Sequence, residues 1–383
     1  MKILHVCLCG PVTDNWNYQD NLITKYHKKL GNEVTIITSN WIFNNSGNLA
    51  LTNKNDYINN DDVRIIRLQM KGKNNFNNKF KRFKGIKKAI YCQSPDIVFI
   101  HGCQFIDIKY IVKYVKSNPH VKVYVDNHAD VFNSGRNWLS KNLLHKVIWK
   151  KYAQMIEPYV KKYYGVLPAR VDFLVDMYKL PKSKVELLVM GADDEKVEEA
   201  KKSNSKHAIR KNNGITENDF LIITGGKVDD NKTQIMLLMR AINEINNCNL
   251  KLIIFGSVSP KYEDEFNSLL SENVIYIGWI NPKDTYKLFN AADLVVFPGL
   301  HSVFWEQVVG LGIPTVFKWM KGFTHIDLGG NCKFLYQDSV SEMKELIIDI
   351  KNNSKLYNNM KYVSETKGME EFSYKKIALK SLS

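Results

Sequence analysis

The stretch that decides the fold lies in the second half of the chain and reads Phe220-Leu221-Ile222-Ile223-Thr224-Gly225-Gly226-Lys227. Its apolar, β-branched run predicts a buried strand, and the two glycines predict a turn directly after it. Lys232 follows five residues after Lys227, at the expected start of a helix. Glycines let backbone amides approach an anion, and the helix N-terminus and the lysines add positive charge. The pattern fits a phosphate-binding loop or, alternatively, a tight turn with solvent-facing lysines; it lacks the GxxxxGK[ST] sequence of a P-loop.

A second anchor follows at residues 297–314, where a strand ends at Pro298 and a loop leads into a helix. Glu306 falls in the first turn of that helix. Its carboxylate either complements the helix dipole or accepts hydrogen bonds from ribose hydroxyls, as acidic residues do in dinucleotide sites. Ser302 and the loop amides are candidates for phosphate oxygens, and His301 for phosphate or sugar.

Strand-like and helix-like segments alternate on both sides of these loops. Strands are predicted at 3–9, 33–38, 63–68, 96–102, 121–126, 185–190, 220–226, 250–255, 274–277, 293–297 and 315–317. Helices are predicted at 106–115, 235–245, 262–270, 285–290, 305–309 and 370–382, and a surface helix plus linker at 195–213. Short buried strands alternating with helices indicate parallel sheets covered on both faces. A chain of 383 residues suits two such domains, so we predict an α/β protein with two doubly wound, Rossmann-like domains facing a cleft.

The charge indicates an anionic partner. The chain carries 54 Lys and Arg against 39 Asp and Glu, a formal net charge of +15. Nucleic acid, an acidic membrane and phosphorylated small molecules all fit such a surplus, and solubility alone is the alternative. Residues 79–88 and 141–162 alternate lysines with apolar residues, which is typical of basic helices lying on anionic membranes. We see no nucleic-acid motif and expect no nucleic-acid partner.

The six cysteines are widely spaced and form no CxxC pair, which favours free thiols over a zinc site or a disulfide framework. The apolar run after Met1 is too short to span a membrane and lacks a small-residue cleavage site. We therefore expect a cytoplasmic protein, with peripheral attachment to the inner face of the cell membrane as a further possibility.

The second half resembles glycosyltransferase family 4, which has the GT-B fold. Its G-R-x-x-x-x-K-G pattern corresponds to Gly226-Lys227 with Lys232, and its E-A-x-x-x-G-x-P-V pattern is similar to the segment from Glu306 to Val316, which is two residues longer. The resemblance implies that both lysines and the amides around Ser302 and Val303 bind the diphosphate, and that Glu306 binds the ribose. The strand at 274–278 resembles the family's V-x-F-L-G, which implies that Gly278 and Trp279 lie beside the base.

Two departures from the family pattern affect the donor site. Lys227 stands where the family carries Arg, so bidentate geometry is lost. Pro298 stands where the first Glu of E-x7-E belongs, and that Glu lies near the donor sugar in the family. We hypothesise that His301 and the loop amides replace its contacts.

The first half supplies candidates for the acceptor side. His128 follows a strand end; it is either a satisfied core or capping residue or, as the family's H-D and H-x-x-D segments imply, a group facing the donor sugar. Asp130 either belongs to the same site or caps the following helix. Gly10 lies in the loop that matches the family's Gly-rich acceptor loop. The remaining acceptor-side candidates are Arg136 and Trp138, whose polar loop either lines the acceptor site or merely leads into a helix, and Arg170, which the resemblance places near the cleft.

The resemblance implies a domain at 1–190 on the acceptor side, a nucleotide-sugar domain at 191–365, and a C-terminal helix at 366–383 that returns to the first domain. It also implies a retaining, hexosyltransferase-like transfer from a nucleoside-diphosphate sugar to a saccharide or lipid-linked saccharide, in bacterial capsule or cell-surface polysaccharide synthesis. Because lysines neutralise the diphosphate, we expect neither metal nor cofactor. The alternatives are a GT-B nucleotide-sugar epimerase and an inactive glycosyltransferase-like partner protein.

Overall fold

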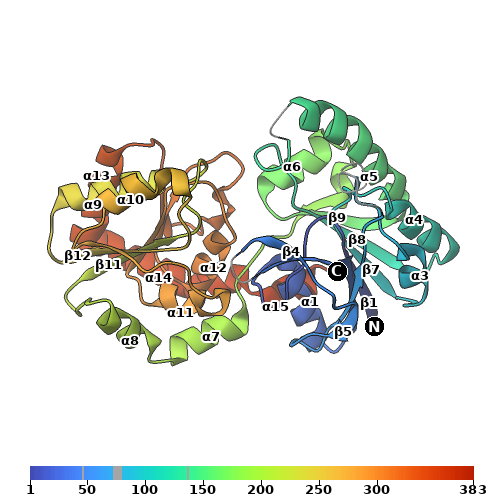
Figure 1. Ribbon diagram of the computed structural model, residues 1–383, viewed down its shortest axis with the longest axis horizontal. Coiled ribbons are helices and arrows are strands. Elements are labelled where there is room, and N and C mark those ends of the chain that lie inside the picture. The colour runs from blue at the N-terminus through green and yellow to red at the C-terminus, as the bar shows by residue number, and fades with distance from the viewer. Residues whose placement is uncertain (45–46, 72–79, 136–137) are drawn as a thin grey trace. The chain divides into compact units, whose positions relative to one another are not determined.

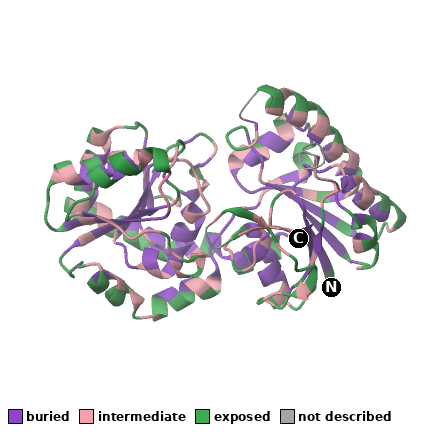
Figure 2. Ribbon diagram, in the orientation of Figure 1, coloured by how far each residue is buried: buried purple, intermediate pink, exposed green. Residues whose placement is uncertain are grey.

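The computed structural model describes residues 1–383 apart from 45–46, 72–79 and 136–137. These residues form two compact units, Met1–Met190 together with Lys375–Ser383, and Gly191–Tyr374. In both units the central strands of the sheet are mostly buried and the outer helix faces are exposed (Figure 2). None of the helices in the described residues is long and apolar enough to cross a lipid bilayer.

The first unit contains an eight-stranded sheet in the order β10-β9-β8-β7-β1-β2-β6-β5, parallel throughout except for the pair β5–β6. Its strands are β1 (Lys2–Cys7), β2 (Glu33–Ser39), β5 (Asp56–Ile58), β6 (Arg64–Leu68), β7 (Ile97–His101), β8 (Lys122–Asn127), β9 (Val160–Gly165) and β10 (Val185–Leu187). A separate hairpin joins β3 (Trp41–Phe43) to β4 (Leu49–Leu51). Its helices are α1 (Gln19–Lys29), α3 (Ile86–Tyr91), α4 (Ile108–Ser117), a π-helical segment (Ser140–Trp149), α5 (Lys150–Ile156), α6 (Pro168–Asp176) and, from Lys375 onward, α15 (Tyr374–Lys380).

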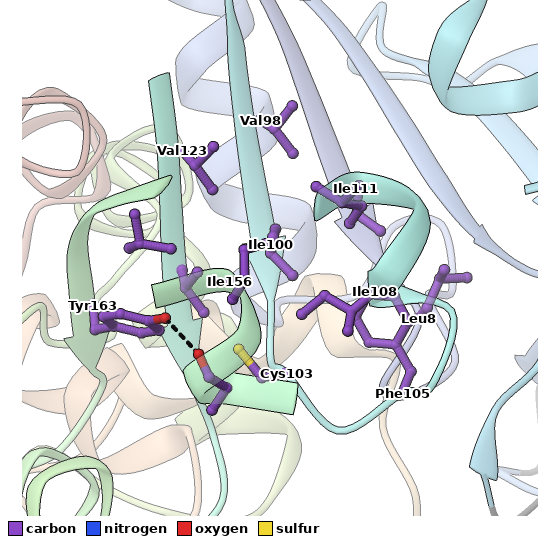
Figure 3. Packing of buried hydrophobic residues seen from close by; sticks show 14 of the residues in the cluster. Leu8, Val98, Ile100, Cys103, Phe105, Ile108, Ile111, Val123, Ile156 and Tyr163 are labelled. Atoms are coloured by element: carbon purple, nitrogen blue, oxygen red, sulfur yellow. Dashed lines mark hydrogen bonds between the residues drawn. The ribbon is translucent and has the colours of Figure 1, made fainter. Parts of the chain in front are cut away.

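The two faces of this sheet have different chemistry. On one face, aliphatic side chains such as Val98, Ile100 and Val123 pack against Ile108 and Ile156 of the covering helices (Figure 3). The opposite face carries the alternate residues of the same strands and lies under α1 and α15, which are side by side in Figure 1. That second face is unusually polar, because β1 and β7 place histidines on it.

The second unit contains a six-stranded, fully parallel sheet in the order β13-β12-β11-β14-β15-β16, so its strands follow the 3-2-1-4-5-6 order of doubly wound folds. The strands are β11 (Phe220–Gly225), β12 (Leu250–Phe255), β13 (Val274–Tyr276), β14 (Leu294–Phe297), β15 (Thr315–Lys318) and β16 (Cys332–Leu335). The helices are α7 (Asp194–Lys202), α8 (Ser205–Asn212), α9 (Gln234–Ile245), α10 (Glu263–Ser268), α11 (Thr285–Asn290), α12 (Phe304–Leu311), α13 (Val340–Asn352) and α14 (Ser354–Phe372).

Four sequence predictions were wrong in detail. The basic stretch 141–162 is helical only to Tyr159, because α5 ends in a 3₁₀ turn (Glu157–Tyr159) that contains Pro158 and the chain continues as β9. Within 80–88, the described part of the other basic stretch, Phe83 is fully buried and bridges Met70, so the helix begins only at Ile86. The segment 195–213 forms two helices, α7 and α8, rather than a helix and a linker.

The fourth error concerns the C-terminus. The predicted helix 370–382 is interrupted, because Ser373 is extended and lies in a parallel bridge with Ala192. Residues 366–372 therefore belong to α14 in the second unit, and the part that joins the first unit starts at Lys375.

Candidate functional site

The loops at the carboxyl ends of β11 and β14 lie at the topological switch point of the second unit. Strands β12 and β13 continue the sheet on one side of β11, and β15 and β16 continue it beyond β14. In open α/β sheets, ligands bind at the carboxyl ends of the strands where the strand order reverses. The fold therefore brings the glycine loop at 225–232 and the loop at 298–303 to one binding edge.

Lys232 passes between glycines from both loops. A Cβ added to Gly226 would lie 2.9 Å from Lys232 Nζ, and a Cβ added to Gly299 would lie 3.1 Å from Lys232 Cγ. Gly226 also has a φ of +126°, which side-chain-bearing residues rarely adopt. These glycines thus leave room for the Lys232 side chain at the edge of the sheet.

The charge of Lys232 is poorly compensated. Burial lowers the pKa of its ammonium, while Asp229 has the smaller, opposite effect. Among the described residues, no carboxylate oxygen lies within ion-pair distance of Lys232 Nζ, and no protein group accepts a hydrogen bond from it. A half-buried ammonium of this kind gains most from an anionic ligand.

The other donor-side candidates after β11 and β13 differ in how they are placed. Lys227 is exposed to solvent. Gly225 is required by packing, because a Cβ there would lie 2.2 Å from the ring of Phe255. Gly278 has a φ of +72° and its carbonyl accepts a hydrogen bond from the Gly256 amide at 2.8 Å, while Trp279 is 53% exposed.

Glu306 is completely buried in the first turn of α12. Its Oε1 accepts hydrogen bonds from His301 Nε2 at 2.8 Å and from His325 Nε2 at 2.9 Å. Burial alone would raise the pKa of this carboxyl, but the two imidazoles outweigh burial and bring the pKa down to about 2. Glu306 is thus held as a carboxylate, and one of its two oxygens is occupied by histidines.

His301 directs its Nε2 to Glu306 and its side chain is only 7% exposed, so the hypothesised sugar contact stays a prediction. Its ring also packs edge-on against Trp305.

Buried polar atoms near Glu306 lack protein partners within the described residues. These atoms include Glu306 Oε2, Ser302 Oγ, Trp305 Nε1 and His325 Nδ1. Buried polar groups in folded proteins are nearly always hydrogen-bonded, so such a cluster indicates a polar ligand or ordered water. Val303 is half-buried and precedes α12 directly.

In the first unit, His128 lies just beyond the end of β8. Its side chain is 37% exposed, and its Nε2 lies 3.3 Å from Asp126 Oδ1, a contact that lacks hydrogen-bond alignment. Asp126 is fully buried. His128 is therefore accessible on one side and held near an anionic carboxylate on the other.

Asp130 and Arg170 bind each other instead of projecting outward. Arg170 Nε donates to Asp130 Oδ2 at 3.0 Å, and Asp130 Oδ1 accepts the amides of Phe132 and Asn133 at 2.8 Å each. Asp130 thus caps the turn at 131–134 and not a helix, and Arg170 lies in a buried ion pair. Trp138 is 76% exposed, and Arg136 lies outside the described residues.

Gly10 borders an apolar pocket at the carboxyl end of β1. The pocket has a volume of about 350 Å³. Its lining includes Leu8, Pro11, Trp41 and Met70, with Lys81 as its cation. Since β1 and β7 flank the switch point of this sheet, the pocket occupies the first unit's counterpart of the edge described for the second.

Two groups of possible metal ligands occur in the described residues, Cys7–Asp20–His101 and His101–Asp126–His128, with donor atoms within 4.8 Å of one another. Burial raises the pKa of the Cys7 thiol to about 12, so this sulfur is not a thiolate at neutral pH. We assign no metal to either group.

Sequence reasoning missed Gly299, Gly256 and His325. Both glycines could have been found from the sequence. Gly256 directly follows the predicted strand at 250–255, and Gly299 directly follows Pro298, where the next anchor's strand is predicted to end. His325 had no such signal, since it reaches Glu306 from a 3₁₀ turn, Thr324–Ile326, that lies 19 residues further along the chain.

Two doubly wound parallel sheets in one chain, each with a switch point, are the architecture of the GT-B class of fold. Residues 205–367 match the family model described as "Glycosyl transferases group 1". An uncharacterized glycosyltransferase of Methanocaldococcus jannaschii is 26% identical over 157 residues, which cover 39% of this chain and 40% of that protein. The chain thus spans less than half the length of this curated relative.

Solved structures share the fold over the full length. A glycosyltransferase from Rickettsia africae superposes with a TM-score of 0.71 at 16% identity, covering 100% of this chain and 96% of that one. Anabaena HepE in complex with UDP gives 0.67 at 13% identity, covering 99% and 98%. A UDP-GlcNAc 2-epimerase from Neisseria meningitidis bound to UDP-GlcNAc gives 0.64 at 13% identity, covering 100% and 99%. At these identities the likeness concerns the fold, and GT-B architecture is confirmed.

Proposed function

We propose that this protein is a retaining glycosyltransferase that transfers a hexose-type sugar from a nucleoside diphosphate to an acceptor hydroxyl. The observation that carries the proposal is the pairing at one sheet edge of a poorly compensated Lys232 with the buried carboxylate Glu306. The first fits a diphosphate and the second a ribose hydroxyl. The group 1 match over residues 205–367 and the UDP held by the HepE structure support this assignment.

The chemistry follows from where charge develops. When the bond between the sugar and the diphosphate breaks, negative charge grows on the leaving phosphate oxygen. Fixed positive charge and amide dipoles at that oxygen stabilise the transition state. Lys232, Lys227 and the amides around Ser302 and Val303 take this role in the proposal, without a metal ion. Glu306 Oε2, which has no protein partner among the described residues, accepts hydrogen bonds from the ribose hydroxyls of the nucleoside in this proposal.

The donor can be identified by thermal unfolding with a panel of nucleoside diphosphates and their sugars. A ligand at about 100 times its Kd should stabilise the folded chain by about 2.7 kcal/mol. We expect one nucleotide to raise the melting temperature, with a smaller response in Lys232→Ala. If no nucleoside diphosphate changes the melting temperature, the proposed donor site is wrong.

An epimerase is the competing activity, because a UDP-GlcNAc 2-epimerase shares this fold. Incubation with the identified nucleotide-sugar and no acceptor separates the two. Conversion of the sugar without any acceptor would support the epimerase, whereas turnover that requires an acceptor supports the transferase. Binding without turnover against a range of acceptors would support an inactive partner protein.

We propose further that the acceptor is held at an anionic membrane, as a lipid-linked saccharide of bacterial surface-polysaccharide synthesis. An exposed apolar patch in the first unit supports this. Leu139, Leu143 and Val147 follow one another at four-residue spacing, with Val147 57% exposed, and Trp138 precedes them. Lysines at 141, 146, 150 and 151 flank the patch. Apolar side chains among lysines are typical of surfaces that enter the headgroup region.

The patch can be tested by vesicle flotation. The double variant Leu143→Asp/Val147→Asp should lower the fraction bound to phosphatidylserine-containing vesicles by roughly tenfold, because apolar burial is lost and negative charge is added. Ile348→Asp, at an exposed helical position of the second unit, should bind like the unmodified protein. Equal binding to anionic and neutral vesicles would contradict the membrane proposal.

A further inference from the structure

A continuous chain of imidazoles crosses the buried face of the first sheet beneath α1 and α15. His101 Nε2 lies 2.9 Å from His5 Nδ1, and His5 Nε2 lies 3.0 Å from His27 Nδ1. His27 Nε2 lies 3.1 Å from the carbonyl oxygen of Ala378 and 2.9 Å from Ser381 Oγ. The three histidines are at most 3% exposed. His5 and His27 belong to none of the sites described above, and His101 occurs there only in the two groups of possible metal ligands.

The Ala378 carbonyl gives this chain a direction. A carbonyl oxygen only accepts, so His27 Nε2 must carry a proton. Burial lowers the pKa of His27 to about 4, so at neutral pH its Nδ1 is unprotonated and accepts. His5 Nε2 must then donate. Burial likewise lowers the pKa of His5, so His5 Nδ1 accepts in turn and His101 Nε2 must donate.

The other nitrogen of His101 faces two carboxylates. Its Nδ1 lies 2.9 Å from Asp126 Oδ2 and 3.0 Å from Asp20 Oδ1, as ion-pair contacts without full hydrogen-bond alignment. An unprotonated nitrogen would place its lone pair against both anionic oxygens, which is strongly unfavourable in a buried site. Both nitrogens of His101 are therefore protonated, and the ring is a cation.

The titratable groups around His101 agree with this state. They are Asp20 on α1, Asp126 on β8, and Cys7 and His5 on β1. Burial alone would lower the pKa of His101, but the carboxylates of Asp126 and Asp20 outweigh burial and raise it. Gln19 Nε2 also donates to Asp126 Oδ2 at 3.2 Å, which leaves Oδ1 of that carboxylate toward His128.

We propose that the chain Ala378–His27–His5–His101 keeps His101 cationic and thereby holds Asp126 as a carboxylate that orients His128. His101 and Asp126 are then positioning residues, and the C-terminal segment carrying Ala378 and Ser381 contributes to the first unit's site without touching a substrate. The charge of His101 follows from these contacts and from the burial of His27 and His5, whereas the effect on His128 rests on the proposed glycosyltransferase function.

The same argument weighs against a metal at these residues. A doubly protonated imidazole has no lone pair for a metal ion, so His101 cannot serve either of the ligand groups that contain it. Addition of Zn²⁺ to the full chain is accordingly expected to leave the His101 resonances unchanged.

The charge state is measured by NMR on the full chain labelled with ¹⁵N-histidine, with His101 assigned by the loss of its signals in His101→Gln. We expect two protonated nitrogens on His101 and one on each of His5 and His27 at neutral pH.

A matched pair of variants tests the direction of the hydrogen bonds along the chain of histidines. His27→Gln keeps a donor for Ala378 and an acceptor for His5, whereas His27→Leu keeps neither. The pKa of His101 should fall by about one unit or more, a tenfold change in protonation, in His27→Leu but not in His27→Gln.

The sign of the pH effect is fixed by the raised pKa of His101. Its proton is retained below that pKa and lost as pH rises through it, so His27→Leu should lose the proton at a lower pH than the unmodified chain. In transfer assays, kcat of His27→Leu should fall on the order of tenfold with the donor KM unchanged, and its alkaline limb should move to lower pH. His27→Gln should behave like the unmodified chain.

The outcomes separate the two proposals. An unprotonated nitrogen on His101 in the unmodified chain, or equal loss of its proton in both variants, overturns the directional chain whatever the activity. If His101 is cationic but the protein turns over no nucleotide-sugar, the directional chain of histidines stands and the proposed function is wrong. If His27→Leu does not fold by circular dichroism, the unmodified spectrum and His27→Gln still decide the charge state.

Discussion

Replacing Lys232 with alanine should lower kcat for sugar transfer by about two to three orders of magnitude, the usual effect of removing one group that stabilises developing negative charge. The effect should be large because the ammonium is half-buried, has no carboxylate within ion-pair distance among the described residues, and lies between Gly226 and Gly299 at the switch point. Steady-state kinetics with the identified donor would measure it.

The control for Lys232→Ala is Lys261→Ala. Lys261 is exposed and forms a surface ion pair with Asp230 at 2.9 Å, so its removal should leave kcat unchanged. Lys227→Ala tests whether the clamp needs both lysines, as the family resemblance implies. Comparable kcat values for Lys232→Ala and the unmodified protein would remove the phosphate role of Lys232.

The positions of many strands along the chain were predictable because local patterns determine them. In the second unit the runs at 220–225, 250–255 and 294–297 are apolar and β-branched, and each is bounded by glycine, proline or polar residues. The errors arose where local pattern and tertiary context disagree. Lys161 and Lys162 make the sequence of β9 look unlike a buried strand, although its Tyr163 and Tyr164 are fully buried. Lys162 forms an ion pair at 2.9 Å with Glu186 on the neighbouring strand.

Only those residues of the candidate site that lie in short, contiguous sequence motifs could be predicted. The glycine loop, Lys232 and Glu306 each lie in a short segment whose chemistry can be read directly, although their roles stay predictions. The partners of Glu306 could not be read in this way, because His325 is brought in by the fold. The imidazole chain joins residues 5, 27, 101 and 378, which no linear pattern relates. Likewise, Asp130 and Arg170 are 40 positions apart, and only the fold makes them a pair.

Glu306→Ala should destabilise the second unit by about 3 kcal/mol, because two buried imidazole donors lose their shared acceptor. For a unit of this size that corresponds to a melting temperature lower by roughly 6–12 °C. Glu306→Gln keeps an oxygen for His301 and should lose much less stability. Calorimetry of both variants, with the unit's transition followed separately, would measure the difference; equal melting temperatures for all three proteins would contradict the buried contact.

The pKa of the Glu306 carboxylate also predicts how the stability of the second unit depends on pH. Its folded pKa of about 2 lies below its ordinary value, so its contribution to stability is present above about pH 4.5 and is lost as pH falls toward 2. The unmodified chain should therefore lose more stability than Glu306→Gln over that acid range.

At neutral pH, Glu306→Gln should bind the nucleotide roughly ten- to a hundredfold more weakly, because a neutral amide replaces a charged acceptor for ribose. Calorimetric titration with the nucleoside diphosphate would measure this loss. Unchanged affinity would show that Glu306 supports the fold through His301 and His325 and does not bind the nucleoside.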